Sequence, residues 1–321
     1  MRSACLMSAA AVLVLAAGCA LPGDRLGRRG DEIVVAGQMF HTGTPVVLWL
    51  DPRGYDAYRA RRHFEPAQTM PANPASPGDP NRYGARRLPA DLAGAVAREG
   101  WTLENLRRQV DQFVIHYDVC GTARQCFRIL QDARGLSVPF MLDIDGTIYQ
   151  TLDLKERAWH AGQANDRSVG VEIAHIGAYR DTRVLDEWYA TGPDGWPYIT
   201  LPSWMRETGV RTPFFIGRPA RRELIRGRIN GQELLQYDFT PEQYAALARL
   251  TAALHRALPG IRLDYPRGPD GRVRDEVLPE ADLAAFQGLL GHWHITRQKV
   301  DPGPAFDWDR VIRGARASVL F

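Results

Sequence analysis

The chain has 321 residues, of which 45% are hydrophobic and 24% are charged. This is ordinary globular composition, with enough residues for one large domain or two small ones. The formal net charge of +3 at pH 7 is too small to indicate nucleic-acid binding, which requires a strong basic patch, so we expect no nucleic-acid partner.

The N-terminus has the organisation of an export signal. Arg2 precedes an apolar run from Leu6 to Ala17, which is too short to be a good membrane span. The run ends in Leu15-Ala16-Ala17-Gly18-Cys19, and small residues before a cysteine resemble a bacterial lipobox. We therefore expect residues 1–18 to be a lipoprotein signal peptide, with Cys19 lipidated.

The residue after Cys19 is Ala20, not the aspartate that retains enteric lipoproteins in the inner membrane. By resemblance to those lipoproteins, we expect an outer-membrane lipoprotein that faces the periplasm and is held to the membrane by its lipid anchor. The alternative is an ordinary secretory signal cut nearby, which would leave Cys19 free and the protein soluble in the periplasm.

Two cysteines remain for the folded part once Cys5 leaves with the signal and Cys19 carries lipid. Cys120 and Cys126 are then an even pair in an oxidising compartment, which predicts a disulfide. Two buried thiols are the alternative, and metal binding by the pair is a third option.

The next segments read as a tether and an N-terminal extension. Residues 19–31, rich in Gly and Arg, are the predicted tether, and residues 32–99 are the extension. Two β-like runs, Ile33–Val35 and Val46–Leu50, flank a turn signal and predict a small hairpin. Residues 65–90 hold many Pro, Asn, Gly and Ser, which is typical of a linker.

Residues 100–321 are predicted to form the main domain, in which strands alternate with helices, and this indicates a mixed α/β fold. The predicted strands are Phe113–Tyr117, Pro139–Ile144, Thr147–Thr151 and Ser168–His175. The predicted helices are Thr122–Arg134, the segment from Thr240 to Leu258, roughly Glu280 to Leu290, and a last helix from near Pro304. Residues 177–235 look like an insertion over one rim of the domain.

A cluster of polar residues near the C-terminus indicates a metal site. His292, Lys299 and Asp301 lie close together in the chain, and histidine and aspartate both bind Zn²⁺. Pro302-Gly303-Pro304 restricts the loop around Asp301. Since a lysine beside a dication is costly, we expect Lys299 to face an anionic group.

Two further residues upstream are candidates for the same site. His116, at the C-terminal end of a predicted buried strand, is the candidate third ligand. Glu172 stands on the opposite face of its strand from Val169, Val171 and Ile173, because strand side chains alternate. Taken alone, this position of Glu172 favours the common alternative of a solvent-facing glutamate on an edge strand.

The order of these motifs along the chain resembles that in the type 2 N-acetylmuramoyl-L-alanine amidases. These enzymes share a fold with the peptidoglycan recognition proteins. The resemblance covers about residues 110–313, without the insertion, and implies a central mixed β-sheet flanked by helices. Its blocks are Val114–Tyr117, Phe140–Gln150, Ala158–Gly162, Ser168–Ile173, and Gly291-His292 with Lys299–Pro304.

The resemblance also implies a role for each candidate residue. His116, His292 and Asp301 would bind one Zn²⁺, Glu172 would be the catalytic carboxylate, and Lys299 would stabilise the transition state. Three protein ligands leave the metal an open position, which marks a catalytic site. In such a site the metal lowers the pKa of water towards about 7 and polarises the substrate carbonyl, and Glu172 would pass the proton to the leaving amine.

Other residues of these blocks would contact the substrate or brace the site. Trp159, His160 and Asn165 would line the substrate groove, and the Cys120–Cys126 spacing resembles the disulfide near the zinc histidine of the recognition proteins. His294 offers a second imidazole beside His292, although the Gly-His pairing favours His292.

The implied reaction is hydrolysis of the amide between the lactyl group of N-acetylmuramic acid and L-alanine, in peptidoglycan or muropeptides, by a monomeric enzyme. The first alternative is a non-catalytic peptidoglycan-binding lipoprotein on the same fold, against which the full set of ligands plus Glu172 and Lys299 argues. A zinc peptidase that acts on stem peptides and a purely structural lipoprotein are the other two.

Overall fold

The computed structural model describes residues 27–59, 62–64 and 82–319. The predicted signal peptide 1–18, Cys19, most of the predicted tether and most of the predicted linker lie outside the described residues. Within the described ranges, no helix combines the length and the apolar character needed to cross a membrane.

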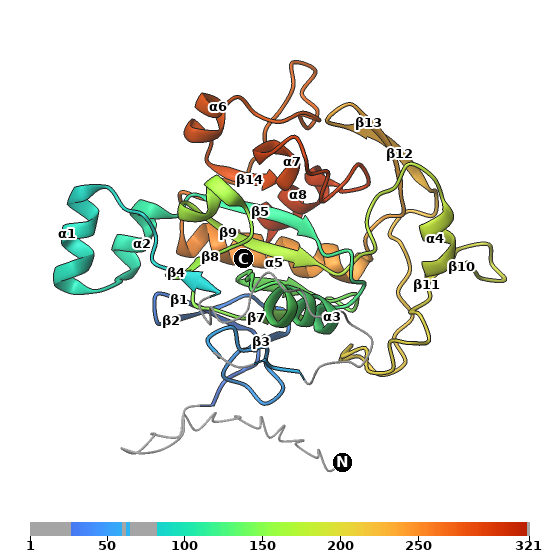
Figure 1. Ribbon diagram of the computed structural model, residues 1–321, viewed down its shortest axis with the longest axis horizontal. Helices are drawn as coiled ribbons and strands as arrows, with labels where there is room; N and C mark the ends of the chain where they lie inside the picture. Colours follow the sequence, from blue (N-terminus) through green and yellow to red (C-terminus); the bar gives the residue numbers. More distant parts are fainter. Residues whose placement is uncertain (1–26, 60–61, 65–81, 320–321) are drawn as a thin grey trace, which may run out of the picture.

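A six-stranded mixed sheet forms the centre of the molecule (Figure 1). Its strands, in spatial order, are β14 (Gly288–Gly291), β5 (Gln112–Tyr117), β9 (Ser168–Ile173), β6 (Phe140–Leu142), β7 (Ile148–Gln150) and β3 (Val46–Leu48). The first four strands are parallel, β7 is antiparallel to β6, and β3 is parallel to β7. The predicted mixed α/β fold with a central sheet is confirmed.

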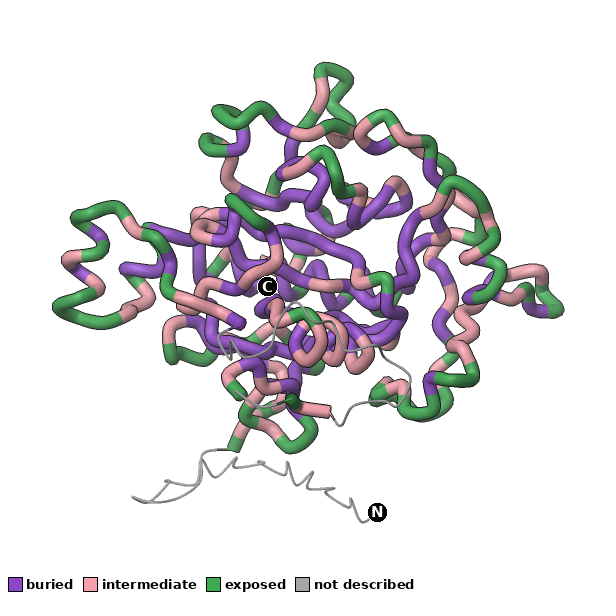
Figure 2. Tube along the Cα trace, viewed as in Figure 1, coloured by how far each residue is buried: buried purple, intermediate pink, exposed green. Residues whose placement is uncertain are grey.

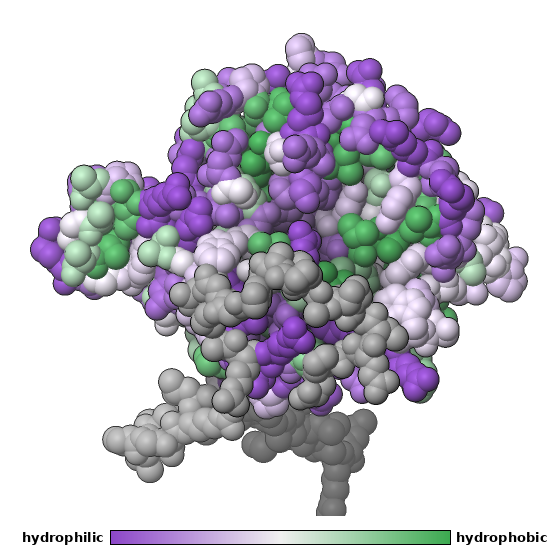
Figure 3. Space-filling model, in the orientation of Figure 1, coloured by the Kyte–Doolittle hydropathy of each residue, from purple (hydrophilic) through white to green (hydrophobic). Residues whose placement is uncertain are grey.

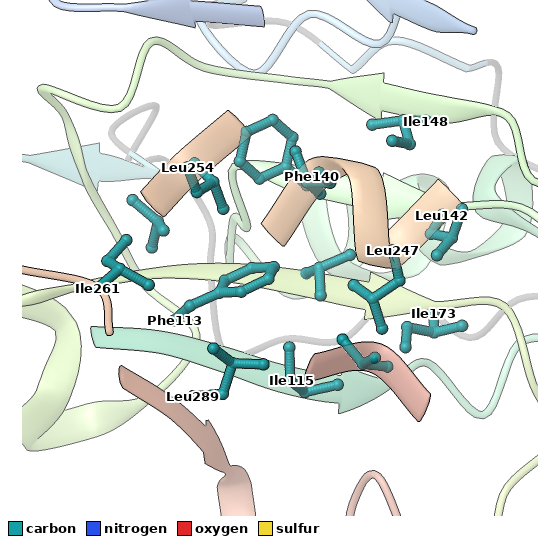
Figure 4. Close-up of a cluster of buried hydrophobic side chains, with 14 of the residues drawn as sticks. Phe113, Ile115, Phe140, Leu142, Ile148, Ile173, Leu247, Leu254, Ile261 and Leu289 are labelled. Atoms are coloured by element: carbon teal, nitrogen blue, oxygen red, sulfur yellow. The ribbon is translucent and has the colours of Figure 1, made fainter. Parts of the chain in front are cut away.

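One face of the sheet packs on two long helices. Alternate side chains of the central strands, such as Phe113 and Ile115, point into the main core with Leu247 and Leu254 of α5 (Pro241–Ala257), as Figure 4 shows. Helix α5 begins with the predicted capping box and packs against α8 (Trp308–Val319). Because the central strands are buried on both faces, their sequences read as near-continuous apolar runs (Figure 2).

The opposite face carries short helices and leaves room for a site. Its cover includes α3 (Ala123–Phe127), which continues into the π-helix η1 (Arg128–Ala133), and α7 (His292–Ile295). Helix α3 packs on Met141 and Tyr149, whose side chains alternate with those that face α5. The predicted helix Thr122–Arg134 is therefore confirmed, with Thr122 as its N-cap.

The predicted pairing of the N-terminal hairpin is wrong. Strand β1 (Glu32–Val35) pairs with β2 (Gln38–His41), and β3 instead becomes the edge strand of the main sheet. The reason is the two-residue turn Ala36-Gly37, where both φ angles are positive (49° and 76°), as a tight hairpin turn requires. Gln150 then ties β1 to the main sheet by accepting from Val34 N and donating to Val34 O.

The predicted helix from Glu280 to Leu290 is wrong in its second half. Helix α6 ends at Ala285 (Glu280–Ala285), and residues 288–291 form β14, which pairs with β5. The backbone is already extended at Phe286, with a ψ of 138°. Gly288 then starts the strand with a φ of 137°, where a Cβ would lie 2.6 Å from Asp264 O, so only glycine fits this position. The last helix, α8, likewise starts at Trp308 and not near Pro304.

The remaining elements lie around the rim of the sheet (Figure 1). The insertion forms an arm of three short units on the right of the figure: helix α4 (Arg183–Trp188), hairpin β10 (Tyr189–Thr191) with β11 (Pro197–Ile199), and hairpin β12 (Ile225–Ile229) with β13 (Gln232–Gln236). On the left lie α1 (Ala90–Glu99) and α2 (Leu103–Gln109), and near them β4 (Tyr83–Gly84) pairs with β8 (Arg157–Ala158). The 3-10 helix η2 (Gly162–Asp166) precedes β9.

Candidate active site

The site is built at the carboxyl ends of adjacent strands. His116 of β5 and Glu172 of β9 are register partners on neighbouring parallel strands, so their side chains leave the same face side by side. Gly291 at the end of β14 pairs with Ile115, which brings the following His292 to the same edge. The sheet therefore joins residues that lie far apart in the sequence.

Three of the predicted residues converge on one point. Nδ1 of His116 lies 2.8 Å from Oδ2 of Asp301 and 3.1 Å from Nδ1 of His292, and the latter two atoms are 3.1 Å apart. All three residues are buried. In a tetrahedral zinc site with bonds of about 2.0–2.1 Å, neighbouring ligand atoms are about 3.3 Å apart. The donor set and its spacing therefore fit one divalent ion of the zinc type.

The electrostatics of these groups suit metal binding. Burial, and then the neighbouring His292, lowers the pKa of His116 to about 4, so its imidazole is neutral at pH 7. Burial alone would raise the pKa of Asp301, but the charge of His292 and the close approach of both imidazoles hold the pKa well below its usual range. A neutral imidazole and an ionised carboxylate are the ligand forms a metal requires.

Glu172 and Lys299 stand beside this group. Glu172 is half-buried, and its Oε2 atom is buried with no hydrogen-bond partner among the described residues. Burial, followed by the charges of Asp301 and Asp118, raises the pKa of Glu172 well above its usual value, while Lys299 opposes the shift. Lys299 is exposed and borders the same cavity. A carboxylate that is buried and unpaired next to a metal site is suited to proton transfer.

A cavity of about 280 Å³ connects these residues. His116, His292 and Asp301 lie in its wall together with Glu172 and Lys299, and Trp159 and His160 border it as predicted. Around the grey atoms, Figure 3 shows hydrophilic and hydrophobic residues in separate groups on one face of the molecule. The cavity therefore has ionisable side chains in its wall.

His160 does more than line this cavity. Its Nδ1 lies 3.0 Å from Nε2 of His116, and its Nε2 lies 3.5 Å from Oγ of Ser168. A Cβ on Gly170 of β9 would lie 2.5 Å from two atoms of the His160 ring. Any larger residue at position 170 would therefore clash with this ring. His160 therefore forms a hydrogen bond with Nε2 of His116, the ring nitrogen that faces away from Asp301 and His292.

The position of Asn165 does not support its predicted contact with substrate. Asn165 is buried, is absent from the cavity wall, and its Oδ1 accepts from the backbone N–H groups of His160 (3.2 Å) and Ala161 (2.7 Å). Asn165 instead stabilises the backbone turn that presents His160. The pattern of its block could not separate a side chain that supports the groove from one that lines it.

The alternative ligand His294 is excluded by its hydrogen bonds. Its Nδ1 accepts from Gly291 N at 2.9 Å and its Nε2 donates to Arg274 O at 2.8 Å. Both ring nitrogens are therefore in use, and burial lowers the pKa of His294 to about 3. His292, and not His294, lies beside His116 and Asp301.

The predicted disulfide is absent from the described structure: Cys120 and Cys126 are both free and buried. The Sγ atom of Cys120 donates to Asp118 O at 2.9 Å instead, and Cys126 packs with Phe127 and Met141 in the core under α3. The two thiols are close in space, and with an oxygen of Asp118 they lie within 4.8 Å of one another. The alternative of two buried thiols describes the structure.

The cavity residues that were not predicted from the sequence include two polar ones in and after η1. Arg134, which ends η1, and Ser137 in the following loop both border the cavity. Nothing in their local sequence distinguishes them from surface residues, since their position depends on how η1 and the loop cross the sheet. Arg134 is exposed and adds a second cation to the wall beside Lys299.

Among solved structures, three similar chains share low sequence identity with this one. The selenomethionine derivative of AmpD is 20% identical with a TM-score of 0.33, over 74% of this chain and 90% of that chain. The amidase AmiD from E. coli, in complex with the substrate anhydro-N-acetylmuramic acid-L-Ala-D-gamma-Glu-L-Lys, is 18% identical with a TM-score of 0.36, over 64% and 57%. The endolysin LysCS from Clostridium intestinale is 13% identical with a TM-score of 0.33, over 66% and 86%.

Sequence comparison gives the assignment. No curated protein matches the chain. The sequence profile described as N-acetylmuramoyl-L-alanine amidase matches residues 106–304, which is more than half of the chain and contains every residue of the proposed metal group. The chain belongs to the N-acetylmuramoyl-L-alanine amidase family.

Proposed function

We propose that the protein is a zinc-dependent hydrolase that cleaves the amide between N-acetylmuramic acid and the L-alanine of the stem peptide, in peptidoglycan or in muropeptides released from it. The observation that carries the proposal is the convergence of two imidazole nitrogens and one carboxylate oxygen, 2.8–3.1 Å apart, in the wall of a cavity that also holds Glu172 and Lys299.

His116, His292 and Asp301 would hold the ion. Two nitrogens and one oxygen are a zinc donor set that leaves a position free for water or substrate. When bound, Zn²⁺ supplies Lewis-acid chemistry, which makes water more acidic and polarises the scissile carbonyl. His160 keeps the ring of His116 in place by accepting from its Nε2–H, which directs Nδ1 of His116 to the ion.

Glu172 moves the proton in the proposed mechanism. Its buried, unpaired Oε2 accepts a proton from the attacking water as the water oxygen bonds to the carbonyl carbon. The raised pKa of Glu172 then favours retention of this proton until the C–N bond breaks, when it passes to the leaving amine of L-alanine. Lys299 donates to the oxygen that gains negative charge as the carbonyl is attacked.

The family assignment and the charge of the cavity support this choice of substrate. The matching family is that of the N-acetylmuramoyl-L-alanine amidases, and the cavity has the cations Lys299 and Arg134 in its wall, which suit the carboxylates of a stem peptide. Incubation of the zinc-loaded protein with purified sacculi, followed by mass spectrometry, tests the proposal. Free stem peptides that begin with L-alanine support it.

The same experiment separates the alternatives. Shortened stem peptides still attached to the glycan would identify a zinc peptidase, and retention of the protein on sacculi without released peptide would identify a non-catalytic binding protein. Either result contradicts the proposed function.

We also propose that the protein is exported and anchored by lipid at Cys19 in the outer membrane, facing the periplasm. The lipobox-like Leu15–Cys19 supports this proposal. Cys19→Ala should release the protein into the soluble fraction with its amidase activity intact. A variant that fractionates like the wild type would contradict the anchor.

A further inference from the structure

A second cavity, with a volume of about 420 Å³, lies apart from the metal group. Three guanidinium groups and several aromatic rings form much of its wall. The arginines are Arg53, Arg124 and Arg211, and the rings include those of Tyr55, Phe64 and Tyr149. This cavity shares no wall residue with the active-site cavity.

The charges around this cavity are predominantly positive. Arg124 lies over the ring of Phe64, with its Cζ 4.1 Å from the centroid, and pairs with the exposed carboxylate of Glu207. Arg53 and Arg211 are both exposed, and neither has a carboxylate partner in the part of the chain that the structure describes. The cavity therefore offers two guanidinium groups to an anionic ligand, and guanidinium pairs well with carboxylate or phosphate.

The wall behind the arginines is rigid. The rings of Tyr55 and Tyr149 stack with centroids 4.3 Å apart and an angle of 19° between their planes. Tyr149 donates its hydroxyl proton to Gly209 O at 3.2 Å. A Cβ on Gly209 would lie 2.8 Å from Cβ of Arg124 and 3.0 Å from the hydroxyl of Tyr55, so the loop before Arg211 packs tightly on this wall. The cavity is preformed and does not depend on a ligand for its shape.

One helical segment separates the two cavities. Arg124, in the first turn of α3, faces the second cavity, whereas Ile129, Leu130 and Arg134 of the following turns face the active site. A ligand that occupies both cavities would therefore have to extend past this helical segment. The substrate class proposed above, a glycan with repeated peptide branches, is such an extended ligand.

We propose that the second cavity binds a carboxylate-bearing stem peptide of the same wall polymer, at a distance from the bond that is cleaved. This inference rests on the proposed function for its choice of polymer. The cavity would increase the affinity of the protein for intact sacculi without a part in the chemistry, since its residues lie outside the metal group. A short soluble muropeptide cannot occupy both cavities, so its cleavage would not depend on the arginines.

The test compares binding and cleavage in the full chain. The double variant Arg53→Glu/Arg211→Glu reverses two exposed charges, and the double variant Arg262→Glu/Arg313→Glu reverses two exposed charges elsewhere as the control. Co-sedimentation with purified sacculi should show about tenfold weaker binding for the first variant than for the control and the wild type. The value of kcat/KM for a soluble muramoyl-peptide should be the same in all three, and thermal unfolding shows that each is folded.

Two outcomes would overturn the proposal: equal binding of both double variants to sacculi, or wild-type binding that persists after the carboxylates of the sacculi are amidated. Binding should instead be lost when the carboxylates of the sacculi are amidated. If the wild type cleaves no muramoyl-peptide at all, the proposed function fails, while the binding comparison still decides this inference separately.

Discussion

Nε2 of His116 lies 3.0 Å from Nδ1 of His160, so a second imidazole holds the outer nitrogen of one proposed metal ligand. Since Nδ1 of His116 faces the metal group, its Nε2 carries the proton and donates it to His160. Burial, followed by the charge of His116, holds the pKa of His160 well below its usual value, which keeps Nδ1 of His160 available as an acceptor. Such outer partners fix the tautomer and orientation of a metal-binding histidine.

Replacement of this acceptor should weaken metal binding. His160→Phe keeps a ring of similar size but removes the hydrogen bond, and we expect zinc affinity to fall about 10- to 100-fold. Competition with a chromogenic chelator measures this affinity, and circular dichroism confirms the fold. Unchanged zinc affinity in this variant would show that His160 only lines the cavity.

Gly170→Ala should have a related effect through space alone. The new Cβ would lie 2.5 Å from the His160 ring, so the ring must move away from His116, and both zinc affinity and activity should fall. Gly94→Ala on helix α1 is the matched control, because the nearest atom there is the end of the flexible Arg98 side chain at 3.4 Å. Wild-type zinc affinity in Gly170→Ala would mean that the His116–His160 hydrogen bond does not matter.

Metal binding should stabilise the fold. At a free zinc concentration 100 times the dissociation constant, the free energy of unfolding should rise by about 2.7 kcal/mol, which is measurable as a rise in Tm after zinc is added to chelator-treated protein. His116→Ala should abolish the response. His255→Ala should keep it, because His255 lies in helix α5 and its ring bonds the backbone oxygen of Ile261. An equal response in both variants would place the zinc elsewhere.

Asp143 should make stability depend on pH. Its Oδ2 is buried with no partner among the residues described, and burial raises the pKa of Asp143 from 3.8 to about 8. The native state therefore keeps a proton that the unfolded chain loses, and stability falls as the pH rises from about 4 to about 8.

Asp143→Asn removes this titration, because an amide stays neutral. The variant should match the wild type near pH 4 and exceed its unfolding free energy by on the order of 2 kcal/mol at pH 8, since relaxation and water entry reduce the full cost of the buried charge. Urea unfolding at both pH values measures the difference. A gap between the two proteins that does not change with pH would contradict the assignment.

The convergence of His116, His292 and Asp301 could be predicted from the sequence because these residues are chemically distinctive. His116 and Glu172 stand on strands whose alternation is plain, and His292 and Asp301 lie in a short motif with a fixed loop. The family resemblance supplied their roles. In the structure His116, His292 and Asp301 are in contact with one another. Glu172 is the register partner of His116 on the neighbouring strand, whereas Lys299 is exposed. The sequence alone left His294 as a competing ligand, and only its two hydrogen bonds resolved the choice.

The errors have local physical causes. The Ala36-Gly37 turn was overlooked because alanine rarely has a positive φ, and the pairing of β3 with β7 is a long-range contact with no local signal. The predicted helix was continued into β14, since a short apolar run such as residues 288–291 is compatible with a helix or a buried strand. The role of His160 depended on Gly170, ten residues away, which no pattern of spacing reveals.

The proton-transfer role of Glu172 is the central claim, and Glu172→Gln tests it most directly. The amide preserves size and removes the base, so the variant should bind zinc with wild-type stoichiometry while kcat for muramoyl-L-alanine cleavage falls about 10²- to 10⁴-fold. Zinc content and release of L-alanine-terminated peptide are measured on the same preparation. Cleavage at the wild-type rate by a zinc-loaded variant would remove Glu172 from the mechanism.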